Sequence, residues 1–147
     1  MKTIILLRHA KAVDSSSWDD YDTTRPLADK GKEQLKTLPT LFQHCGCVPE
    51  LILASPAART KATAEAVHAL FPKSELVFNP TLYLAEAETI IGLLMQLPKN
   101  INSVCVVGHN PGLYELAIHV KKHDIAMPTL GMVRIDVQYR NWNDLKY

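Results

Sequence analysis

The residue types best suited to catalysis in this sequence stand just after short apolar runs. Arg8 and His9 directly follow one such run, Arg59 comes shortly after a second, and His109 comes shortly after a third. An arginine guanidinium is a planar fork that matches phosphate oxygens and stays charged at any working pH. A histidine nitrogen can attack phosphorus and form a covalent phosphohistidine that water then hydrolyses. Together these residue types favour phosphoryl transfer, which needs positioned cations around the transferring group.

The elements that must position these residues alternate along the chain. Short apolar or alternating runs predict strands, and apolar residues at helical spacing predict helices between them. The expected strands cover residues 3–7, 51–54, 75–78, 103–107 and 132–137. The expected helices begin near Asp29, at Ser55, near Ala85 and after Pro111. Pro39 lies inside the first of these and should kink or split it, because an interior proline costs about 3 kcal/mol.

This alternation predicts an α/β fold, a three-layer α/β/α sandwich around a largely parallel sheet. The expected strands at 3–7, 51–54 and 103–107 are continuously apolar, as is typical of central strands covered on both faces. The run at 132–137 alternates and suits an edge strand. Ligands of open α/β sheets bind outside the carboxyl ends of the strands. The two histidines and two arginines should therefore converge at that edge of the sheet.

Three motifs carry a resemblance to a known family. They read LRHA at 7–10, SPAAR at 55–59 and VGHNP at 107–111, each after a predicted strand. In this order they resemble the histidine phosphatase superfamily, which also contains the phosphoglycerate mutases. The segments RHAK at 8–11 and RPL at 25–27, with the short chain, are most similar to the small SixA-type phosphohistidine phosphatases. The resemblance implies a phosphoglycerate mutase-like fold and a phosphatase that uses neither metal nor cofactor.

The resemblance also implies roles for individual residues. His9 would be phosphorylated during turnover, and Arg8, Arg59 and His109 would complete the phosphate pocket. Arg25 matches an arginine near the pocket of SixA-like proteins, which implies a substrate-binding role. Arg25 alone also suits pairing with acidic residues of the loop before it.

The general acid that protonates the leaving group is less defined. Glu86 is the candidate, with Glu88 and no acid at all as the alternatives, because related enzymes often place a carboxylate in this region. Both residues also suit an ordinary first helical turn, where the helix dipole favours acids. The loop after the first strand carries Asp14, Asp19, Asp20 and Asp22 and lacks the EF-hand pattern, so we interpret it as solvated.

Composition limits the partners. The 147 residues contain 16 Lys plus Arg and 15 Asp plus Glu, a balance that argues against a general nucleic-acid binder. The apolar run at residues 4–7 is too short for a signal peptide or a membrane span, so a cytoplasmic location without membrane association is expected. Three cysteines with no C-x-x-C spacing give no metal or redox motif. The size suits one domain over residues 1–147.

The sequence thus predicts a phosphatase acting on phosphohistidine in a protein or on another phosphomonoester. Three alternatives stay open: a small-molecule phosphatase, a mutase that returns the phosphoryl group, and a non-catalytic module that binds a phosphorylated ligand. The short chain leaves little room for the insertions with which a mutase would exclude water. Oligomeric state is not defined by the sequence.

Overall fold

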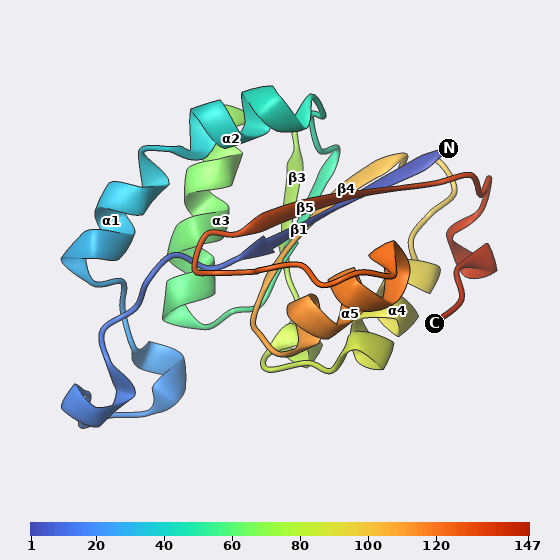
Figure 1. Ribbon diagram of the computed structural model, residues 1–147. Coiled ribbons are helices and arrows are strands. Elements are labelled where there is room, and N and C mark those ends of the chain that lie inside the picture. Colours follow the sequence, from blue (N-terminus) through green and yellow to red (C-terminus); the bar gives the residue numbers. More distant parts are fainter.

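Five strands form one mixed sheet in the computed structural model, which describes residues 1–147. The strands are β1 (Lys2–Arg8), β2 (Leu51–Ala54), β3 (Glu75–Phe78), β4 (Ser103–Gly108) and β5 (Met132–Val137). Their spatial order is β3-β2-β4-β1-β5, and only β5 runs antiparallel, paired with β1 at one edge (Figure 1). The predicted α/β class, the largely parallel sheet and the edge position of the alternating strand are confirmed.

Helices cover both faces of this sheet, which makes three layers (Figure 1). One side carries α1 (Asp29–Leu35), α2 (Leu38–Cys45) and α3 (Ala58–Leu70), and the other carries α4 (Ala87–Met95) and α5 (Gly112–Lys121). Short 3₁₀ turns lie at Ser15–Ser17, Asp22–Thr24, Pro80–Leu82 and Trp142–Asp144. No helix is both long and apolar enough to span a bilayer.

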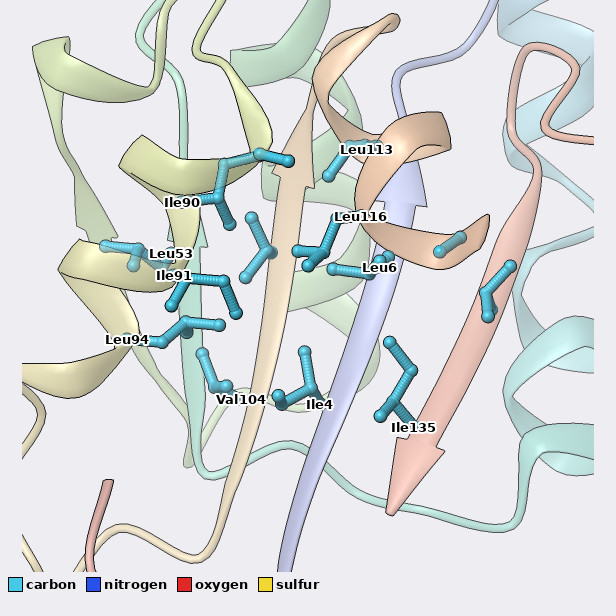
Figure 2. Packing of buried hydrophobic residues seen from close by; sticks show 14 of the residues in the cluster. Ile4, Leu6, Leu53, Ile90, Ile91, Leu94, Val104, Leu113, Leu116 and Ile135 are labelled. Atoms are coloured by element: carbon cyan, nitrogen blue, oxygen red, sulfur yellow. The ribbon is translucent and has the colours of Figure 1, made fainter. Parts of the chain in front are cut away.

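Successive side chains of β1 point to opposite faces of the sheet, and both faces are covered, so the whole apolar run is buried. Ile4 and Leu6 pack into the cluster beneath α4 and α5, while Ile5 and Leu7 pack into the cluster beneath α2 and α3. Figure 2 shows the first cluster, in which Leu6 lies beside Leu116 of α5 and side chains of α4 such as Ile90 and Leu94 cover the same face of the sheet. Burying one such side chain contributes about 1.5–3 kcal/mol. The strand is thereby held on two faces, which fixes the residues at its carboxyl end.

The helices agree with the sequence prediction at Pro39 and differ from it at Ser55. The expected break at Pro39 is confirmed, because α1 ends at Leu35 and the proline falls in the first turn of α2, where its missing N–H costs nothing. The predicted helix start at Ser55 was wrong, since α3 begins at Ala58. Ser55 lies just past the end of β2, and its N–H donates to the Val107 carbonyl of β4 (3.1 Å).

Candidate active site

The two histidines lie side by side because their strands are neighbours. β1 and β4 are parallel and in register, with Arg8 opposite Gly108. The His9 N–H donates to the Gly108 carbonyl at 3.2 Å, and the ring centroids of His9 and His109 lie 5.5 Å apart. The carboxyl ends of these two central strands therefore bring the two histidines together, as predicted for ligand sites of open α/β sheets.

One ring nitrogen of His9 is fixed as a donor. Nδ1 lies 2.7 Å from the Ala10 carbonyl, which can only accept, so Nδ1 carries the proton. His9 is 7% exposed, and this burial lowers its pKa to about 4, with the charges of Arg59 and Arg8 acting in the same direction. In the neutral ring, Nε2 then holds a free electron pair. This is the state that a nucleophile requires.

A relay of backbone and hydroxyl contacts holds His9 in place. The Leu130 N–H donates to the His9 carbonyl at 3.0 Å. The Ala10 N–H donates to Thr63 Oγ1 at 3.0 Å, and that hydroxyl donates to the Arg59 carbonyl at 2.8 Å. Thr63 thus ties the end of β1 to the first turn of α3, and so ties His9 to Arg59.

Two of the three arginines that line the pocket, Arg8 and Arg59, have some N–H groups bonded within the protein and one left without a partner. Arg59 is 2% exposed and donates from Nη1 to the Asp22 carbonyl and from Nη2 to Asp22 Oδ2, both at 3.0 Å. Arg8 donates from Nη1 to the Met127 carbonyl at 3.2 Å. The Nε of each is buried without a hydrogen-bond partner. Buried donors are normally paired, so two N–H groups here lack the acceptor that burial calls for.

His109 has one bonded and one unpartnered nitrogen. Its Nε2 lies 2.8 Å from Ser55 Oγ, and its buried Nδ1 has no partner. Burial lowers the pKa of His109 to about 3, and Arg59 and His9 add to this effect. The ring of Tyr83 meets it edge-on at 5.5 Å. Ser55, where a helix was expected to begin, instead orients His109 through this hydrogen bond.

Asp22 lines the pocket, so the prediction that it belongs to a merely solvated loop is wrong. Its carboxylate accepts hydrogen bonds from Arg59, from Arg25 and from the Tyr83 hydroxyl. The Tyr83 hydrogen bond is the largest of the causes that lower the pKa of Asp22 to about 2, followed by Arg59. The Asp22–Arg25 spacing of three residues was the signal available in the sequence, and Tyr83 gave none.

These side chains surround a pocket of about 490 Å³. Its lining consists mostly of polar residues, namely Arg8, His9, Lys11, Ala12, Asp14, Ser15, Asp22, Arg25, Arg59, Tyr83, Leu84, His109, Asn110 and Thr129. No group of three or more His, Cys, Asp or Glu side chains is arranged to hold a metal ion. The donors present suit an anion.

Comparison with known proteins decides the family. The family model for the histidine phosphatase superfamily (branch 1) matches residues 4–83 of the chain. The chain belongs to this superfamily. Its motif-based recognition is thereby confirmed, and with it the expectation of a phosphohydrolase that works through a phosphohistidine.

Individual relatives agree with this placement. A putative phosphohistidine phosphatase SixA from Agrobacterium tumefaciens has 29% identity and a TM-score of 0.82, over 92% of this chain and 91% of that one. A protein histidine phosphatase SixA complexed with tungstate shares the fold, with 20% identity and a TM-score of 0.74 over 92% and 88% of the chains. An uncharacterised chloroplastic protein of Arabidopsis thaliana is 29% identical over 156 residues, which cover 97% of this chain and 70% of that protein.

Of the remaining predicted site residues of this histidine phosphatase, one lies in the pocket and two lie outside it. Arg25 lines the pocket and also pairs with Asp22 (3.2 Å), so both of its sequence interpretations agree with its position. Glu86 and Glu88 do not line the pocket. Both are exposed at the start of α4, where the helix dipole favours an acid. The structure does not bring the candidate general acid to His9.

The low pKa values of the two histidines give this phosphatase a predictable pH dependence. At a pH below 6.5, the usual pKa of histidine, both side chains stay neutral in the folded protein. The same two residues take up protons in the unfolded chain at that pH. Stability should therefore fall as the pH drops from about 6.5 towards 4. His9 should stay neutral, and competent as a nucleophile, at pH 5. NMR titration of its ring should give a midpoint near 4, and a midpoint near 6.5 would contradict this assignment.

Proposed function

We propose that this phosphatase removes the phosphoryl group from phosphohistidine carried by a protein, through a covalent intermediate on His9. The observation that supports this most is the set of unpartnered buried nitrogens around His9. Arg8 Nε, Arg59 Nε and His109 Nδ1 come from three pocket-lining residues and all lack a hydrogen-bond partner. A phosphoryl group has three oxygens that accept such bonds.

In the first step His9 Nε2 attacks the phosphorus. The bond between phosphorus and the substrate's ring nitrogen breaks, and its electron pair leaves with that nitrogen. A substrate imidazole that is protonated on its other nitrogen leaves as a neutral ring. The positive charge that develops on His9 is stabilised by the Nδ1–H bond to Ala10. Arg8, Arg59 and His109 hold the phosphoryl oxygens, and Arg25 contributes charge at the pocket.

In the second step water attacks the phosphohistidine. The bond between phosphorus and His9 breaks, the ring recovers its electron pair and keeps its Nδ1 proton, and both protons of the water leave with inorganic phosphate. A protonated imidazole leaves more readily than an alkoxide, so the first step has little need for a protein acid when the substrate is phosphohistidine. This agrees with the position of Glu86 and Glu88 outside the pocket.

Relatives support the substrate class. Two similar structures are named as SixA phosphohistidine or histidine phosphatases. We further propose that residues 1–147 act as one histidine phosphatase domain, because both core clusters pack on the same sheet. Independence from metal and cofactors, a cytoplasmic location and the lack of nucleic-acid or membrane partners stay predictions of the sequence.

The substrate assignment is tested by phosphate release in the presence of a chelator. A phosphohistidine peptide should be hydrolysed with a higher kcat/KM than an aryl phosphate. Preference for the ester would instead indicate a small-molecule phosphatase, and an isomerised product would indicate a mutase. Binding of the peptide without any phosphate release would indicate a non-catalytic module.

A further inference from the structure

Leu84 has an unfavourable backbone conformation and lies at the edge of the active-site pocket. It lines the pocket, and it is 52% exposed. Its backbone is left-handed, with φ of 49°. This conformation places Cβ too close to the following carbonyl oxygen, so it is unfavourable for a residue such as leucine.

The local geometry is that of a type II β-turn over residues 82–85. The Ala85 N–H donates to the Leu82 carbonyl at 3.2 Å, and Tyr83 has φ of −62° and ψ of 115°. Leu84 is the third residue of this turn. That position requires positive φ and is normally filled by glycine or asparagine.

Two other non-glycine residues have positive φ, and packing or hydrogen bonding explains both. Lys122 (φ 63°) ends α5, and its N–H donates to the Ile118 carbonyl. Leu130 (φ 59°) is 6% exposed, and its N–H donates to the His9 carbonyl. Leu84 makes no backbone hydrogen bond and buries only half of its surface. Leu84 therefore has neither a backbone hydrogen bond of its own nor full burial to offset its strain, and the turn is held by its neighbours.

The neighbours of Leu84 keep the turn in place. Leu82 is buried, and the Ala85 carbonyl packs so closely on α5 that a Cβ at Gly112 would lie 1.9 Å from its oxygen. Tyr83 bonds Asp22 across the pocket. Glycine or asparagine would fit the turn with less strain, yet an apolar side chain is presented to solvent beside the catalytic groups. Strain of this kind at a site is a reason to infer a role in function.

We propose that Leu84 is a specificity-determining residue that packs against the leaving group, the ring and adjoining side chains of a phosphorylated polypeptide. The proposal rests on the proposed function. Leu84 is the only aliphatic side chain larger than alanine that lines this otherwise polar pocket. The arginines and histidines bind the phosphoryl group, so an apolar side chain at the rim meets the molecule that carries it. A small donor such as phosphoramidate has no such part.

The test compares a phosphohistidine peptide with phosphoramidate, since both present a phosphorus–nitrogen bond to the same pocket. Leu84→Asn introduces a residue that is favoured at this position of the turn, and it removes the apolar contact. The ratio of kcat/KM for the peptide to kcat/KM for phosphoramidate should fall about five- to tenfold, as expected for losing contact with roughly half a leucine surface. Leu84→Met should keep the wild-type ratio.

Stability separates this role from a structural one. Leu84→Asn should raise the urea midpoint, and Lys122→Asn, which relieves the same strain away from the pocket, should raise it too and keep the wild-type ratio. An unchanged ratio in Leu84→Asn, or equal losses on both substrates, would overturn the inference. Wild-type protein inactive towards both substrates would overturn the proposed function itself, and this inference with it.

Discussion

Replacement of His9 by alanine is expected to lower phosphate release by about 10⁴-fold or more, because it removes the nucleophile of the proposed mechanism. The fold should survive. His9 makes one side-chain hydrogen bond, to Ala10, and a bond of this kind contributes about 0.5–1.5 kcal/mol to stability. Turnover and urea unfolding of the same preparation measure both quantities.

The control for His9→Ala is His123→Ala, which removes an exposed histidine that does not line the pocket. It should turn over like the wild type. A His9→Ala protein that is folded and still releases phosphate at more than about a hundredth of the wild-type rate would remove His9 from the role of nucleophile.

Arg59→Lys is expected to lower kcat/KM by about 10²-fold, although the charge is kept. Lysine lacks the planar fork, and the substitution removes the Nε of a pocket-lining arginine that is buried without a partner. The same change breaks the paired contacts from Nη1 and Nη2 to Asp22, so the loop that carries Asp22 should also loosen. Steady-state kinetics on an aryl phosphate and limited proteolysis measure the two effects.

The matched control is Arg140→Lys, at an exposed arginine outside the pocket. It should leave kcat/KM within about twofold, as expected for a surface substitution. If Arg59→Lys behaved like this control, charge alone would suffice at Arg59, and the geometric account of its guanidinium would be wrong.

The sequence predicted the sheet well because each strand had a strong local pattern. The buried run of β1 and the alternation of β5 correspond to two-sided and one-sided burial, and Pro39 ended a helix for reasons within its own backbone. The start of α3 was missed because Ser55 can either cap a helix or continue a strand. Only the pairing of Ser55 with β4, distant in sequence, decides between the two.

The candidate site was predicted as far as strand ends could define it. His9 and His109 adjoin neighbouring parallel strands, so their proximity follows from topology. Asp22 and Tyr83 reach the pocket from loops, and loop conformation depends on contacts that no local pattern records. The region of the chain that suggested Glu86 does reach the pocket, but with Leu84, while Glu86 and Glu88 lie exposed at the start of α4 and do not line it.

The central claim is that the phosphoryl group passes through His9, and trapping of the phosphoenzyme tests it most directly. The enzyme is mixed with a phosphoryl donor, quenched in alkali to preserve phosphohistidine, digested and examined by mass spectrometry. The account predicts one phosphoryl group on the peptide that contains His9, formed within a single turnover and absent from His9→Ala. A phosphoryl group on another residue, or full turnover without any phosphoenzyme, would contradict it.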